Sequence, residues 1–199
     1  MTLSYQVPEE FKSTEYIVKK SKFICWVAPI ESRQDALALV EKAKRDYPDA
    51  RHHCWAYILG NPQSASAASH DDGEPSGTAG KPILNVLQHK NTGDLVAIVI
   101  RYFGGIKLGA GGLVRAYSSA TQQTFDTLTL IEKIPHQTVM IECDYSDEPD
   151  LRQWLSTHNG SIVSAEYQQK VVLKLSLPSD SKMELHALLA GWSGAGIKD

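Results

Sequence analysis

The stretch DLVAIVIRYFGGIKLGAGGLVRAY, residues 94–117, decides the fold of the first part of the chain. Its first nine residues are almost continuously apolar, which is typical of a central strand that is buried on both faces. Five glycines follow within residues 103–112, and residues 113–130 then show the apolar spacing of a helix. The stretch therefore predicts a strand, a glycine-rich turn and a helix in direct succession.

The glycine-rich turn has two interpretations. Glycines before a helix let the backbone adopt positive φ and bring several N–H groups toward one point, where an anion can bind. Lys107 and Arg115 flank that point. The alternative is that the glycines only turn the chain and allow close helix–sheet packing. No complete nucleotide motif decides between them, because Val114 replaces the last glycine of a dinucleotide fingerprint and Pro75 the first glycine of a P-loop.

Residues 60–82 form a long polar segment without a regular pattern, and such loops are often functional. Within it, residues 70–81, HDDGEPSGTAGK, gather acidic, hydroxyl and basic side chains. This crowding suits acid–base catalysis or a hard cation. It also suits an ordinary solvated turn whose side chains bond their own backbone.

Composition limits the remaining possibilities. The net charge is −3, but residues 1–135 carry 15 Lys and Arg against 14 Asp and Glu, so this part is the better candidate to meet an anion. The three cysteines show no paired spacing, and no apolar run is long enough to span a membrane. His52 and Cys54 fall on one face of a predicted strand, without a zinc spacing. We therefore expect a cytoplasmic protein with no metal, no cofactor and no membrane contact.

The rest of the chain gives a clear order of elements. Before the quoted stretch we expect a strand or hairpin, a helix with Ser32 as N-cap, a strand, and a helix that begins at Pro82. After residue 135 the pattern is β-α-β-β-α, followed by a glycine-containing tail at residues 192–199 that allows only a short, altered or missing last strand. The expected elements are residues 16–30, 32–44, 54–59, 82–91, 138–145, 147–158, 161–168, 171–177 and 179–190.

Three runs together resemble a known family. Residues 71–84, DDGEPSGTAGKPIL, residues 101–117, and the pattern A-x-H-x-C-x-A-Y at residues 50–57 look like the signature of the IMPACT family, and of its bacterial members in particular. The resemblance implies an α+β protein with two domains. Residues 1–134 would form a two-layer α/β domain. This domain would be similar to the second domain of a small-subunit ribosomal protein and to domain IV of elongation factor G. Residues 135–199 would form a ferredoxin-like domain.

The resemblance also implies a role in translation. Eukaryotic members resemble regulators that compete for the activator of an initiation-factor kinase, and the fold of the bacterial members suggests contact with RNA or the ribosome. We expect a translation-associated binding protein, not an enzyme, that contacts RNA, the ribosome or a translation factor through a groove in its first domain. The candidate binding residues are His52, Asp71, Asp72, Glu74, Ser76, Thr78, Lys81, Arg101, Tyr102, Gly104, Gly105, Lys107, Gly109, Gly111, Gly112, Arg115 and Tyr117.

Two alternatives stay open on the sequence. The first is an enzyme acting on a small phosphorylated or acyl substrate, with His70 or Glu74 as the base and the glycine turn holding the anion. The second is a protein-interaction module whose acidic second domain docks a partner protein.

Overall fold

The computed structural model describes residues 4–198, which divide into two compact units: residues 5–133 form the first, and residues 134–198 together with residue 4 form the second. The α+β fold class is confirmed, because both units combine helices with antiparallel sheets. In the described residues, no helix has the length and apolar character needed to cross a membrane. The elements of the first unit are β1 (Tyr5–Pro8), β2 (Lys12–Val18), β3 (Ser21–Pro29), α1 (Arg33–Asp46), β4 (His52–Leu59), β5 (Ser66–His70), α2 (Gly80–His89), β6 (Leu95–Tyr102), α3 (Ala110–Phe125) and β7 (Leu130–Lys133).

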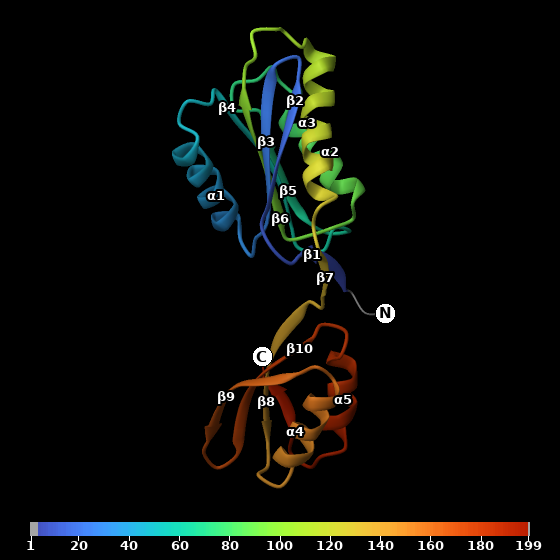
Figure 1. Cartoon of the computed structure of the whole chain (residues 1–199). Coiled ribbons are helices and arrows are strands. Elements are labelled where there is room, and N and C mark those ends of the chain that lie inside the picture. Colours follow the sequence, from blue (N-terminus) through green and yellow to red (C-terminus); the bar gives the residue numbers. More distant parts are fainter. Residues whose placement is uncertain (1–3, 199) are drawn as a thin grey trace. The chain divides into compact units, whose positions relative to one another are not determined.

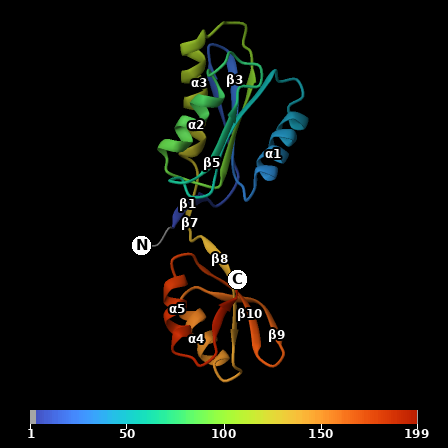
Figure 2. The same cartoon turned by 180° about the vertical axis from the view of Figure 1, so that it is seen from behind.

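A five-stranded antiparallel sheet forms the centre of the first unit, in the order β2-β3-β6-β4-β5. Helices α2 and α3 cover one face, and α1 covers the other (Figures 1 and 2). The prediction of a central apolar strand is confirmed by β6, which is buried on both faces between β3 and β4. The expected two layers are the sheet with α2 and α3, and α1 adds a third layer.

The alternation of side chains along β6 decides which of its last residues point toward α2 and α3 and which point toward α1. Val99 packs on the α2 and α3 side, and Ile100 packs on the α1 side. Because successive strand residues point to opposite faces, Arg101 returns to the α2 and α3 side and Tyr102 to the α1 side. His52 of β4 lies directly opposite Arg101 in the register of the two strands and shares its face.

Several boundaries differ from the sequence prediction. Residues 66–70 form β5, although the whole segment 60–82 was expected to be irregular, because these small residues pair with the edge of β4. Helix α2 begins at Gly80, not at Pro82. Helix α3 begins at Ala110 and ends at Phe125, because two glycines are accommodated in its first turn and residues 130–133 pair with β1 as β7.

The second unit has the predicted βαββα(β) order. One apolar cluster joins its helices to one face of an antiparallel sheet with the order β11-β8-β10-β9. The last strand is short, as expected: three residues pair with β8, and Ile197 packs against the core. The elements are β8 (His136–Cys143), α4 (Glu148–Thr157), β9 (Ser161–Tyr167), β10 (Val171–Pro178), α5 (Lys182–Ala190) and β11 (Gly196–Lys198).

One buried carboxylate joins four segments of the first unit. Asp94, just before β6, accepts hydrogen bonds from the Tyr5 hydroxyl at 2.6 Å and from the Gly60 backbone N–H at 2.7 Å. Lys133 Nζ lies 2.5 Å from the same carboxylate. Burial raises the pKa of Asp94, but the hydrogen bonds from Lys133, Tyr5 and Gly60 outweigh it and hold the pKa below its usual value.

We expect Asp94→Ala to lower the free energy of unfolding by about 2–3 kcal/mol, because it leaves two or three hydrogen-bonding groups without their partner. A carboxyl with a lowered folded-state pKa contributes stability above its unfolded pKa of about 4, and this contribution is lost as the pH falls through the folded pKa. Urea unfolding should therefore show a larger deficit for Asp94→Asn at pH 7 than at pH 3.

The exposed Asp49 supplies the control, since Asp49→Ala should change stability by less than about 0.5 kcal/mol. An Asp94→Asn deficit of the same size at both pH values would contradict the assignment.

Candidate functional site

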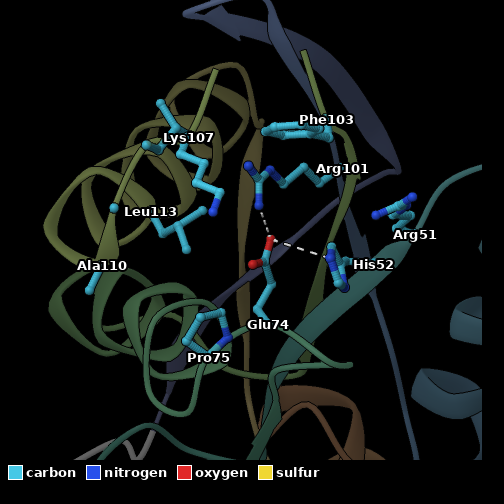
Figure 3. A pocket seen from close by; sticks show the side chains of 11 residues that line it. Arg51, His52, Glu74, Pro75, Arg101, Phe103, Lys107, Ala110 and Leu113 are labelled. Atoms are coloured by element: carbon cyan, nitrogen blue, oxygen red, sulfur yellow. Dashed lines mark hydrogen bonds and ion pairs between the residues drawn. The ribbon is translucent and has the colours of Figure 1, made fainter. Parts of the chain in front are cut away.

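A concave pocket of about 380 Å³ opens between the end of β6, the loop before α2 and the start of α3 (Figure 3). We call it the α3 pocket and define it by Glu74, Arg101, Phe103, Lys107, Ala110 and Leu113. Arg51 and His52 at the start of β4 also line it. The α3 pocket therefore lies on the α2 and α3 face of the sheet, where the alternation along β6 directs Arg101.

A buried ion pair forms the floor of the α3 pocket. The side chains of Glu74 and Arg101 are 3% and 8% exposed, and Arg101 Nη1 lies 2.5 Å from Glu74 Oε1. The Tyr117 hydroxyl donates a hydrogen bond of 2.9 Å to the same oxygen, and His52 Nε2 is 3.9 Å from it. Figure 3 shows Glu74 and Arg101 pointing directly toward each other, with Lys107, Ala110 and Leu113 on the other side of the pocket.

Arg101 keeps donors that the described residues do not use. A guanidinium carries five N–H donors, and the described residues pair Nη1 with Glu74 while the buried Nε has no partner. The guanidinium also lies between two aromatic rings, 5.5 Å from the Phe23 ring centre and 5.7 Å from that of Phe103. These contacts hold a positive charge at a fixed place beside the pocket.

The N-terminus of α3 supplies a second positive feature. Its N-cap is Gly109, whose φ of 72° is readily adopted only by glycine and which offers no side chain to cap the helix. The first helical bond is from the Leu113 N–H to the Gly109 carbonyl, so the N–H groups of Ala110, Gly111 and Gly112 precede the hydrogen-bonded ladder. Together with the helix dipole, these N–H groups favour an anion.

The acidic loop before α2 is organised by its own carboxylates. Asp71 accepts hydrogen bonds from the backbone N–H groups of Gly77 at 2.7 Å, Gly80 at 2.8 Å and Ala79 at 3.0 Å. It thereby caps α2, whose N-cap residue Ala79 has no polar side chain, and this explains why the helix begins before Pro82. Burial raises the pKa of Asp71, but these three bonds outweigh it and hold the pKa below its usual value.

A second set of contacts fastens the loop to β4. The Asp72 carboxylate accepts a hydrogen bond of 2.7 Å from the His53 backbone N–H, and the Asp72 carbonyl lies 2.8 Å from His52 Nδ1. Cys54 Sγ donates to the Asp71 carbonyl at 2.9 Å. The loop is therefore a fixed support that holds Glu74 against Arg101.

The structure brings some of the predicted site residues into the α3 pocket. His52, Glu74, Arg101, Lys107 and Gly109 line it. Gly111 and Gly112 form the adjoining first turn of α3, and Tyr117 reaches the pocket through its bond to Glu74. Asp71, Asp72 and Thr78 fold the loop, the last through a hydroxyl bond of 2.6 Å to the Pro75 carbonyl.

Other predicted residues lie elsewhere. Arg115 lines a separate cavity with Lys19, and Tyr102 packs on the α1 side of the sheet. Ser76 and Lys81 are exposed and are not among the residues that line the pocket.

Two of the glycines in the turn shape the backbone. Gly105 has a φ of 85°, and a Cβ on Gly104 would lie 1.9 Å from the carbonyl carbon of Lys20. The interpretation of the glycines as a structural turn therefore holds at these two positions.

Sequence reasoning missed several lining residues. Arg51, Phe103 and Leu113 line the pocket, and Phe103 is 48% exposed. The period-two spacing from Arg101 to Phe103 was the available signal for the aromatic ring. His70 does not line the pocket. Its ring instead stacks on that of Trp55, with the two ring centres 5.8 Å apart. Within residues 4–198 no group of three or more His, Cys, Asp and Glu side chains is arranged to hold a metal ion.

The fold and the site together define a two-domain protein of a known class. The model of the Impact N-terminal domain matches residues 19–125, and that of a domain of unknown function, DUF1949, matches residues 141–195. The chain belongs to the IMPACT family.

Relatives match over most of the chain. The IMPACT family member YigZ of Escherichia coli is 39% identical over 91% of this chain and 89% of its own length. The IMPACT family member YvyE of Bacillus subtilis is 39% identical over 86% of this chain and 76% of its own length. A crystal structure of a hypothetical protein is 36% identical and superposes with a TM-score of 0.78, covering 99% of this chain and 97% of its own. Membership of this family points to a regulatory role related to translation.

We expect Glu74→Ala to lower the free energy of unfolding by about 3–5 kcal/mol, because it leaves the buried Arg101 charge without its partner. Replacing both members, as Glu74→Leu with Arg101→Met, should cost less than Glu74→Ala alone. Urea unfolding of Glu74→Leu, Arg101→Met and the double variant that combines them forms a cycle that measures the coupling. Additive losses would show that the ion pair does not hold the loop to β6.

Proposed function

We propose that this protein is a translation-associated regulatory binding protein that contacts RNA, and through RNA the ribosome, in the cytoplasm. The observation that carries the proposal is the convergence of three cationic side chains and one free helix N-terminus on the α3 pocket. Arg51, Arg101 and Lys107 line it, and the N–H groups of the first turn of α3 lie at its edge.

The net charge of the chain does not oppose this proposal. Phosphate binding needs positive charge at the contact, and the charge of the remaining surface mainly affects long-range steering. In the α3 pocket the Arg101 guanidinium is fixed by Glu74 and two aromatic rings, so it offers its donors without a large loss of side-chain entropy on binding.

The acidic loop supports binding in preference to catalysis. The carboxylates of Asp71 and Asp72 are engaged with backbone N–H groups, and that of Glu74 is engaged with Arg101 and Tyr117. His70, the other base considered, lies outside the pocket. These groups build and position the wall of the pocket, which is the arrangement that a rigid binding surface needs.

Lys107→Ala and Arg51→Ala should each weaken binding of a single-stranded RNA, and each should reduce the slope of log affinity against log salt by about 1. Lys107 is exposed and Arg51 lies at a strand end, so neither change is expected to affect folding. Fluorescence anisotropy at several salt concentrations measures both quantities.

Arg45→Ala is the matched control. Arg45 is exposed on α1, which covers the opposite face of the sheet, so this variant removes the same charge away from the α3 pocket. Equal affinity and equal salt slope for wild type, Lys107→Ala and Arg51→Ala would refute the proposed RNA contact. An equal effect of Arg45→Ala would assign the binding to net charge.

Association with the ribosome has its own test. Gradient sedimentation of a cell lysate should show the wild-type protein with ribosomal particles at low salt, and nuclease or high salt should release it. Lys107→Ala should sediment mainly as free protein. Sedimentation of the wild-type protein only at the position of a free protein would contradict the ribosomal part of the proposal.

A further inference from the structure

We propose that the α3 pocket binds a nucleoside monophosphate, with its terminal phosphate at the N-terminus of α3 and its base against Phe103. The nucleoside monophosphate is either the phosphorylated end of an RNA strand or a free nucleotide. This inference rests on the proposed function and narrows it from RNA phosphates in general to a phosphate at a chain end.

The shape of the α3 pocket favours a chain end. Its volume of about 380 Å³ lies at the lower end of the range typical of small-molecule sites, about 300–1,000 Å³. A pocket of this size is suited to one nucleotide and is too small for a duplex. Internal phosphates of a helix lie on a convex surface, whereas the first or last nucleotide of a strand can enter a concave site.

The phosphate position is defined by two independent features. The first is the start of the 16-residue helix α3, where the N–H groups of Ala110, Gly111 and Gly112 precede the first helical bond. The second is Arg101, which is more than nine-tenths buried and lines the same pocket; the described residues pair its Nη1 with Glu74 and leave Nη2 without a partner and not fully buried, so Nη2 can donate to a ligand. Backbone N–H groups and a guanidinium are the donors that phosphate oxygens accept best.

The charge of the α3 pocket fits a phosphomonoester better than a phosphodiester. Arg51, Arg101 and Lys107 are positive and Glu74 is negative, which leaves two positive charges. A terminal phosphate carries about −1.5 to −2 near neutral pH, whereas an internal phosphodiester carries a single negative charge. The dianion therefore balances the pocket, and the diester leaves one positive charge uncompensated.

The remaining walls suit a base. Phe103 is 48% exposed and lines the pocket with its ring, and Leu108, Leu113 and Pro75 supply further apolar surface. Arg101 lies against one side of the Phe103 ring, so the aromatic surface is held in place beside the phosphate position. Stacking on an exposed aromatic ring is tolerant of sequence, because every base has a π face.

The test compares three RNA decamers of one sequence, with a 5′ phosphate, with a 3′ phosphate, and with neither, by fluorescence anisotropy using an internal label. Adenosine 5′-monophosphate is then added as a competitor. We expect one phosphorylated decamer to bind about tenfold more tightly than the unphosphorylated one, the effect of hydrogen bonds to a charged group. Competition by adenosine 5′-monophosphate identifies a free nucleotide as a ligand, and its failure identifies the strand end.

Ala110→Pro tests the phosphate position without changing any charge. Proline is favoured at the first helical position, and the extended ψ of 165° at Gly109 is compatible with a following proline. The variant removes one N–H donor and should lower the preference for the terminal phosphate by about tenfold. Ala110→Ser keeps the N–H and should keep the preference, and urea unfolding confirms that both variants fold.

The outcomes separate this inference from the proposed function. Three decamers of equal affinity that all weaken in Lys107→Ala would overturn the inference and leave RNA binding in place. No decamer binding together with binding of adenosine 5′-monophosphate would support the pocket chemistry and overturn the RNA contact. A terminal-phosphate preference that Ala110→Pro leaves unchanged would overturn the placement at α3.

Discussion

The ion pair between Glu74 and Arg101 is the interaction on which the functional face of the first unit depends. It joins a polar loop to the end of the central strand β6, and the side chains of both partners are buried. A buried pair of this kind contributes little net stability compared with apolar residues, but it is costly to break. Its main effect is geometric: it fixes the loop, the guanidinium and the Tyr117 hydroxyl as one rigid group.

The charged side chains and backbone N–H groups around this pair are arranged so that the pocket favours an anion. The carboxylates of the loop are turned inward to backbone N–H groups, so they organise the wall and do not repel a negative ligand. The positive groups that line the pocket beside this pair are the helix N-terminus of α3, Lys107 and Arg51. A chain of net charge −3 thereby presents a locally positive pocket.

The sequence could predict the parts of this arrangement that follow from short-range rules. The period of two along β6 places Arg101 on the same face as Val99, which is the face that α2 and α3 cover, and the glycines before α3 indicate a helix N-terminus without a side-chain cap. Long-range choices could not be predicted. Nothing local shows that Asp71 caps a helix eight or nine residues later, or that the helical turn directs Arg115 into a different cavity. The strand β5 likewise depends on the free edge of β4, since its own residues have low strand propensity.

The most direct test of the account is to follow the backbone and guanidinium signals of the isotope-labelled protein by NMR while a single-stranded RNA is added. We expect the N–H signals of Ala110, Gly111 and Gly112 and the guanidinium signals of Arg101 to shift first and to saturate together. Signals on α1 should stay in place. Shifts confined to α1 or to the second unit, with an unchanged α3 N-terminus, would contradict the claim that the α3 pocket is the binding site.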